Sequence, residues 1–254
     1  MKILLPPSET KRPGGRGGPA AMESWALPEL APQREATADA LIALSADEER
    51  AARVLSLSER QRGAIADNAS LRTAPTMPAV DRYTGVLFDA LDAPSLPSAG
   101  RRWLGAHVWI HSAPFGPVGA LDPIPAYRLG AAASVPGLPP LRRHWATAVS
   151  EAIAAAAPRF VLDLRSEAYV ALGPVPEEVP AAYVRVVTES GRALNHFNKH
   201  AKGLLVRALA ETRPRAATRR GFLAWARGEG LDVRETSDPR VIELVTAQAA
   251  TSLS

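Results

Sequence analysis

Cysteine is absent from the 254-residue chain, which excludes disulfide bonds, cysteine-ligated zinc, iron–sulfur clusters and thiol catalysis. A chain without disulfides also fits a reducing compartment. Long hydrophobic runs are missing too, because no stretch reaches the ~18 apolar residues of a membrane-spanning helix. The apolar run at residues 3–7 is shorter than the ~7–15 residues in the core of a signal peptide. We therefore expect a cytoplasmic protein with no membrane partner.

Lysine is scarce, whereas arginine is abundant. Lys2, Lys11, Lys199 and Lys202 are the only lysines among 30 basic residues, and the net charge is +4. This positive balance permits a nucleic-acid or phosphate partner without requiring one. Abundant arginine and alanine are typical of a GC-rich genome, so each retained lysine is a candidate for a role that arginine cannot fill.

Hydrophobic periodicity predicts an irregular alternation of strands and helices. The predicted strands cover residues 2–5, 106–111, 160–164, 183–187, a position near 233, and 241–245. The predicted helices cover residues 34–44, 45–57 with Ser45 as N-cap, 58–65, a short segment ending at 91, 141–157, 198–212 and 216–227, and residues 112–130 form a structured loop. No repeat or low-complexity linker divides the chain. We therefore expect one α+β domain, residues 1–254, in which helices surround a mixed β-sheet.

Four polar segments lie at the ends of predicted strands or in loops next to them. They are residues 6–11, 112–129, 163–169 and 195–203. Ligands of α/β sheets bind outside strand ends, so convergence of these segments would create a site. That site would hold several cations, carboxylates and two tyrosines, and the start of the helix near residue 198 would add amide donors. This chemistry favours an anionic ligand.

In order and spacing, these segments resemble the bacterial YaaA family of peroxide stress proteins. The matching pieces are ILLPPSETK (3–11), RYTGV (82–86), the loop through Asp122 and PAYRL (125–129), the Leu-x-Ser-x-x-Tyr pattern in DLRSEAY (163–169), and the spacing of Lys199, Gly203 and Arg207. The resemblance covers nearly the whole chain. It implies a distinctive single-domain architecture with a positively charged cleft, a helix-hairpin-helix-like element and DNA binding. It also implies protection against hydrogen peroxide by limiting the damage that unincorporated iron causes.

The sequence departs from the better-known branch of this family in two places. Residues 6–10 read Pro-Pro-Ser-Glu-Thr in place of Ser-Pro-Ala-Lys-Thr, with Lys11 one position later. Residues 114–119 replace a Leu-Tyr-Gly-Val-Leu-Arg loop and lack its arginine. The last third of the chain matches poorly. The resemblance therefore transfers the fold more directly than the biological role.

The matching segments supply the residues that we expect to line the cleft and to contact a ligand or DNA. They are Ser8, Glu9, Thr10, Lys11, Tyr83, Asp122, Tyr127, Arg128, Ser166, Glu167, Tyr169, Lys199, Lys202 and Arg207. No catalytic residue and no cofactor is assigned. Lys199 and Lys202 are interpreted as anion contacts, with a pair of amines of lowered pKa as the alternative.

Two familiar kinds of site find little support in the sequence. His196 and His200 have the spacing of metal ligands on a helix, but no carboxylate lies between them and Lys199 would repel a cation, so no metal site is expected. Ser166 lacks the Gly-x-Ser-x-Gly elbow of a serine hydrolase. It is expected to orient a ligand, with Tyr169, or to cap a helix.

Two functions from different classes therefore stay open. The first is a cytoplasmic peroxide-response protein that binds double-stranded DNA, favoured by the family resemblance and the basic balance. The turn at Gly137 and the arginines after it fit phosphate contacts, but a solvated helix face is the preferred explanation of these arginines. The second is an enzyme or binder that acts on a small anionic metabolite in a deep pocket. It is favoured by the carboxylates of the matching segments, which would repel phosphate: Glu9, Asp122, Asp163 and Glu167. We favour the first and retain the second as the alternative.

Overall fold

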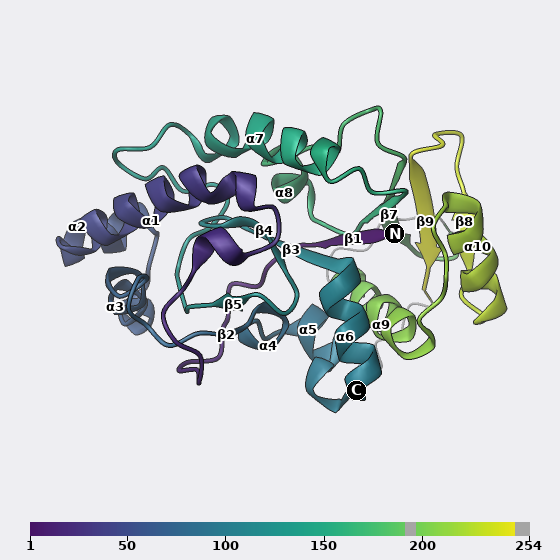
Figure 1. Cartoon of the computed structure of the whole chain (residues 1–254), viewed down its shortest axis with the longest axis horizontal. Helices are drawn as coiled ribbons and strands as arrows, with labels where there is room; N and C mark the ends of the chain where they lie inside the picture. Colours follow the sequence, from purple (N-terminus) through teal and green to yellow (C-terminus); the bar gives the residue numbers. More distant parts are fainter. Residues whose placement is uncertain (191–196, 247–254) are drawn as a thin grey trace.

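The computed structural model of the chain describes residues 1–190 and 197–246. Its described part contains a mixed seven-stranded sheet in the order β4-β3-β1-β6-β7-β9-β8 (Figure 1). The strands are β1 (Lys2–Leu5), β3 (Val108–Ser112), β4 (Gly116–Gly119), β6 (Val161–Asp163), β7 (Ala181–Val187), β8 (Val233–Glu235) and β9 (Val241–Val245). The inner strands are parallel, and β4 and β8 pair antiparallel at the two edges. This sheet confirms the predicted fold class.

Helices cover both faces of the sheet. They are α1 (Ala31–Ser45), α2 (Glu48–Val54), α3 (Ala64–Ala69), α4 (Ala79–Arg82), α5 (Val86–Leu91), α6 (Ser98–His107), α7 (Leu141–Ala155), α8 (Glu167–Ala171), α9 (Phe197–Thr212) and α10 (Arg219–Gly228). Figure 1 shows α7 and α8 above the sheet and α5, α6 and α9 below it. A second, two-stranded sheet joins β2 (Met77–Pro78) to β5 (Pro123–Ile124). Among the helices of the described residues, none has the length and apolar character needed to cross a membrane.

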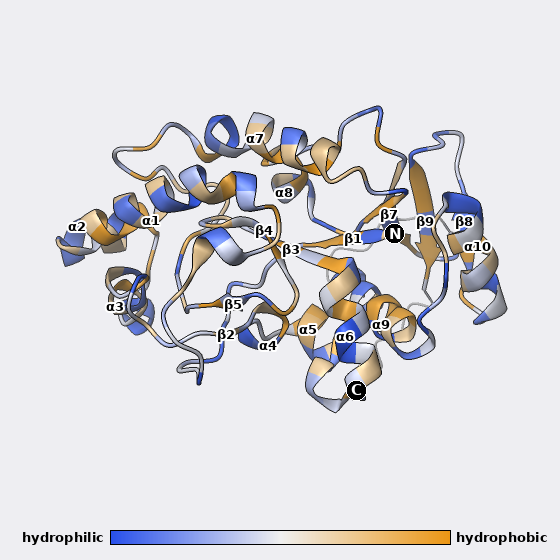
Figure 2. Cartoon of the chain, in the orientation of Figure 1, coloured by the Kyte–Doolittle hydropathy of each residue, from blue (hydrophilic) through white to orange (hydrophobic). Residues whose placement is uncertain are grey.

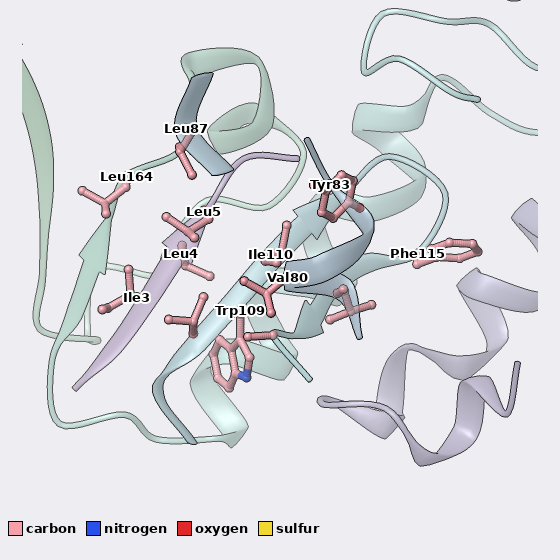
Figure 3. Close-up of a cluster of buried hydrophobic side chains, with 14 of the residues drawn as sticks. Ile3, Leu4, Leu5, Val80, Tyr83, Leu87, Trp109, Ile110, Phe115 and Leu164 are labelled. Atoms are coloured by element: carbon pink, nitrogen blue, oxygen red, sulfur yellow. The ribbon is translucent and has the colours of Figure 1, made fainter. Parts of the chain in front are cut away.

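The strand sequences explain their places in the sheet. Residues 3–5 of β1 and all of β3 are buried, as expected for inner strands covered on both faces. In β7, buried Ala182, Val184 and Val186 alternate with more exposed residues, so one face of this strand is less covered. Figure 2 shows β9 and β7 as mainly hydrophobic, and Figure 3 shows Leu5 and Ile110 in one apolar cluster with Tyr83 and Leu87.

Some predicted boundaries are wrong. The strand predicted over 106–111 starts at Val108, because a helix that was not predicted, α6, extends through His107. Ser45 is the last residue of α1 rather than an N-cap, and Asp47 caps α2 by accepting a hydrogen bond from the Arg50 amide. At both positions the helix extends over residues that the local sequence assigns differently, because tertiary packing outweighs short-range propensity.

The predicted loop over 112–130 contains two strands, β4 and β5. The Ser112 hydroxyl accepts a hydrogen bond from the Phe115 amide and donates one to the Gly116 carbonyl, which closes a tight turn after β3. Gly116 has φ +61°, a conformation that glycine adopts without strain. The turn therefore folds β4 back along β3.

The chain connections diverge at the carboxyl ends of β1 and β6. The connection leaving β1 leads to β3 on one side of β1, whereas the connection leaving β6 leads to β7 on the other side. Such a switch point leaves a crevice where α/β proteins bind ligands. The segments 6–11 and 164–169 start at this point, so the topology brings two of the predicted polar segments together.

Candidate functional site

The segment after β1 pairs with the segment after α4. Lys11 and Tyr83 form an isolated antiparallel bridge, and the Thr84 amide donates to the Thr10 carbonyl at 3.2 Å. The hydroxyls join as well, because Thr84 Oγ1 donates to Thr10 Oγ1 at 2.9 Å and Ser8 Oγ lies 3.3 Å from the latter atom. Two predicted segments separated by some seventy residues therefore form one wall.

Lys11 lies at the centre of this wall. Its ammonium is 4.0 Å from the ring centroid of Tyr127 and 5.6 Å from that of Tyr83. Its Nζ donates to the carbonyls of Ser8 and Glu9 at 3.0 and 3.2 Å. Burial and the nearby Arg128 charge lower the pKa of Lys11 to about 7. The lysine is therefore held in a fixed place, and both its protonated and its neutral form are populated near pH 7.

Two buried tyrosines form the back of the site. The hydroxyls of Tyr83 and Tyr127 share a hydrogen bond of 2.8 Å, and Phe88 and Phe115 pack against the rings. Burial raises the pKa of both phenols, so they stay neutral. They offer a rigid aromatic surface beside Lys11 rather than a negative charge.

A weak ion pair lies at the front. Arg128 Nη2 is 3.3 Å from Glu9 Oε2, and the Glu9 side chain is 81% exposed. Burial raises the pKa of Tyr169, and the Glu9 charge contributes, so this phenol lies near the pair. An exposed pair of this length contributes little to stability. Arg128 is consequently available to a competing anion.

A stronger network fills the floor behind Tyr169. Buried Arg165 pairs with Asp163 through Nε and Nη2 at 2.9 and 2.6 Å. Its Nη1 donates to the Gly173 carbonyl and to His111 Nδ1, both at 2.8 Å. Because Asp163 neutralises the guanidinium, this network is a structural anchor for the end of β6 rather than a free cation.

The network fixes the tautomer of His111. A guanidinium only donates hydrogen bonds, so His111 Nδ1 must accept and the ring proton lies on Nε2. Within the described residues Nε2 has no partner although the side chain is fully buried. Its ring lies 5.9 Å from that of Tyr169. Burial, with the Arg165 charge, lowers the pKa of His111 well below its usual value.

Lys202 approaches the same floor from α9. Its buried Nζ lies 5.2 Å from the Tyr183 ring centroid and 3.4 Å from the Arg165 carbonyl. Burial lowers its pKa to about 8. Lys199, one turn earlier, is exposed. The predicted lysine pair is therefore divided, with one amine in the core and the other at the surface.

Two predicted site residues lie elsewhere. Asp122 accepts hydrogen bonds from the amides of Ala26 and Gly119, at the amino edge of the parallel strands. Arg207 donates to the carbonyls of Leu91 and Asp92, and these bonds join α9 to the end of α5. It also pairs with Glu211 within α9. The structure therefore gives both side chains structural contacts outside the cluster.

The remaining predictions concern the rim. Ser166 and Glu167 are exposed at the start of α8, and the Ser166 side chain makes no cap hydrogen bond. Residues 195 and 196 of the polar segment lie outside the described residues, so the structure does not place the histidine pair. Among the residues it does describe, His, Asp and Glu side chains form no group of three that could hold a metal ion.

Two cavities border the cluster. One of about 700 Å³ is lined by Arg12, Arg16 and Arg101, and one of about 230 Å³ by Tyr83 and Asp89, among others. Lys11 lines neither cavity. We call the group formed by Lys11, Tyr83, Tyr127, Arg128 and Glu9 the Lys11 cluster.

Sequence reasoning missed His111 and Arg165 as part of the site. His111 lies within the apolar strand β3 and Arg165 follows the apolar strand β6. A polar residue in such a place is normally interpreted as an isolated core residue or a solvent-exposed one. The available signal was the charge pattern Asp163-x-Arg165 directly after a buried strand, because such charges need partners when buried.

The comparisons with known proteins match most of the chain. The sequence model described as "Peroxide stress protein YaaA" matches residues 1–234. The UPF0246 protein CE1889 of Corynebacterium efficiens is 46% identical over 239 residues, covering 92% of this chain and 94% of the relative. The UPF0246 protein SCO2297 of Streptomyces coelicolor is 44% identical over 217 residues, covering 84% of each. The chain therefore belongs to the YaaA (UPF0246) family of peroxide stress proteins.

Proposed function

We propose that the chain acts in the cytoplasmic response to peroxide stress, and that the Lys11 cluster binds a small anionic metabolite on which that response depends. The observation that carries the second part is the placement of Lys11. Its ammonium lies against two tyrosine rings, at the switch point of the sheet, beside Arg128.

The charge balance of the Lys11 cluster supports a small ligand. Arg128 interacts with exposed Glu9 over 3.3 Å, and a ligand carboxylate or phosphate could take the place of Glu9. Arg165 is already neutralised by Asp163, and Lys202 is buried. Arg128 therefore remains as a cationic contact, and Lys11 adds a second one in its protonated form, which suits a compact anion.

DNA binding is the second candidate, favoured by a different part of the surface. The Leu138 amide donates to the Val135 carbonyl and closes a turn. Gly137 in this turn has φ +85°, and no other atom lies within 4 Å of the position that its Cβ would take. Exposed Arg142 and Arg143 follow at the start of α7. Backbone amides and arginines in this arrangement suit phosphate contacts.

A thermal unfolding experiment tests the small-ligand proposal. Inorganic phosphate, oxalate, citrate and pyruvate would each be added to the wild type and to Lys11→Met. We expect at least one anion to raise the Tm of the wild type but not of the variant, because ligands that bind only the native state stabilise it. Arg60→Met, on an exposed side chain, is the control. A Tm unmoved by every anion would contradict the proposal.

Binding of a short fluorescent duplex at several salt concentrations tests the DNA candidate. If α7 contacts phosphates, Arg142→Ala with Arg143→Ala should lower the slope of log affinity against log salt by about two. Lys11→Met should leave this binding unchanged. Loss of duplex binding in Lys11→Met alone would instead indicate that DNA contacts the Lys11 cluster.

A further inference from the structure

We propose that Lys11 is the reactive amine of this site, and that it forms an imine with a small carbonyl compound that carries an anionic group, such as a 2-oxo acid. This inference rests on the proposed binding of a small anion. It assigns to Lys11 a chemical role that ligand contact alone would not require.

The hydrogen bonds of Lys11 match those of a neutral amine. A neutral amine has two N–H donors and one lone pair, whereas an ammonium has three donors. Nζ donates to two carbonyls, of Ser8 and Glu9, within the described part of the chain. Deprotonation would leave both bonds in place and would free a lone pair that could attack a bound carbonyl carbon.

The surroundings adjust the protonation of this amine. Burial and the positive charges of Arg128 and Arg82 lower its pKa, while the carboxylates of Glu9 and Asp67 oppose the shift. Tyr83 and Tyr127 face it from the other elements as neutral phenols. The resulting pKa of about 7 makes a large share of Lys11 neutral at physiological pH, as nucleophilic lysines require.

Arg128 supplies the second half of the recognition. The Glu9 carboxylate is exposed and its pair with Arg128 is weak, so a ligand anion that displaces Glu9 would approach Lys11 from this side. A ligand carboxylate replacing Glu9 at Arg128 would place an adjacent carbonyl near Lys11. This juxtaposition selects a compound in which an anionic group and a carbonyl are neighbours.

The reaction is balanced without a further reactant. The nitrogen lone pair attacks the carbonyl carbon, and the carbon–oxygen double bond becomes a hydroxyl. The carbonyl oxygen then leaves as water with the two amine hydrogens, and a carbon–nitrogen double bond forms. Neither partner is oxidised or reduced, so the imine can form and hydrolyse reversibly.

Reductive trapping tests the inference. Wild-type protein would be incubated with pyruvate or glyoxylate and sodium cyanoborohydride, and the four lysines would be mapped by mass spectrometry. We expect an adduct on Lys11 at more than tenfold the level on exposed Lys199, and none at position 11 in Lys11→Arg. Equal labelling of Lys11 and Lys199, or no adduct on Lys11, would overturn the inference.

A second measurement uses the wild type alone and needs no ligand. Acetylation by acetic anhydride across pH 5–10 should show half-maximal reactivity of Lys11 near pH 7, well below that of the lysine in a model peptide. A Lys11 profile identical to that of the peptide would overturn the inference. Anion-induced stabilisation that persists without any Lys11 adduct would refute the imine and leave the proposed function intact. A Lys11 adduct without stabilisation by any anion would refute the proposed function instead.

Discussion

Arg34 is a buried cation whose hydrogen-bond partners are main-chain carbonyls. Its guanidinium donates to Met22, Ala26, Phe115 and Pro117 at 2.6–3.0 Å, and burial lowers its pKa to about 10. It therefore joins the segment before α1 to the turn before β4. Replacement of Arg34 by an apolar residue of similar shape would remove the arginine donor from each of these four carbonyls.

We expect Arg34→Met to lower the free energy of unfolding by at least ~3 kcal/mol, because charge-assisted hydrogen bonds in the interior are strong and unpaired buried carbonyls are costly. Urea denaturation measures the loss. Arg60→Met removes an exposed guanidinium and should change stability by less than ~0.5 kcal/mol. Equal effects of the two substitutions would contradict this role for Arg34.

His111 should make stability depend on pH. Its native pKa is lowered, so below pH 6.5 the unfolded chain binds a proton that the native chain does not. Stability is therefore fully present above pH 6.5 and falls with falling pH, by up to ~2 kcal/mol between pH 6.5 and 5. In His111→Gln this part of the dependence should disappear. Urea denaturation of both proteins at pH 7 and 5 measures it.

His200→Gln is the matched control, because His200 is exposed. Its unfolding free energy should follow the wild-type pH dependence, since carboxylates titrate equally in both proteins. A wild type and a His111→Gln variant with parallel pH profiles would show that His111 titrates normally in the native state.

The residues of the Lys11 cluster and its surroundings were predictable to different degrees. Lys11, Tyr83, Tyr127, Arg128 and Tyr169 follow strands or belong to matching segments, and the structure brings them together. The burial of Lys202 beside exposed Lys199 was not predictable, because both face similar sequence surroundings and only the docking of α9 separates them.

At the scale of elements, Gly203 determines how closely α9 approaches α5. A Cβ atom at Gly203 would collide with the Leu87 carbonyl oxygen and lie 2.8 Å from Ala90 Cβ. Four residues later, Arg207 donates to the carbonyls at the end of α5. The Lys199, Gly203 and Arg207 spacing quoted for the family resemblance thus includes a helix contact.

Gly203→Ala should destabilise the protein by ~2 kcal/mol, although alanine favours helix formation, because the clash is with backbone. Gly228→Ala provides the control, because nothing lies within 4 Å of a Cβ at that end of α10. It should be neutral or stabilise slightly, by up to ~1 kcal/mol. Thermal and urea unfolding of the pair measure the difference, and stabilisation by both would contradict the close contact.

Elements were predicted best where the hydrophobic pattern was long. The helices over 141–155 and 197–212 and the strand over 241–245 lie close to their predicted positions. Helix α6 was missed because it contains two glycines and directly follows Pro97, which together indicate a loop, although buried Trp103 and Leu104 anchor it. Strand β4, Gly-Pro-Val-Gly, was missed because glycine and proline normally indicate a loop.

At the scale of the whole molecule, sheet topology positions the site. Strand order cannot be deduced from local patterns, yet the parallel pairing of β1 with β3 and β6 is what brings segments 6–11 and 164–169 to one crevice. Asp122 shows the limit of the sequence argument. It lies in a matching segment, but the chain reversal into β4 carries it to the opposite edge of the sheet.

NMR of the four lysine side chains, in protein labelled with ¹⁵N-lysine, tests the small-ligand site most directly. Pyruvate, oxalate and phosphate would be titrated in turn, and a short duplex separately. We expect at least one small anion to shift the Lys11 signal while the exposed Lys199 signal stays in place. A Lys11 signal that no anion moves, or that moves only together with Lys199 on adding duplex, would contradict the small-ligand site.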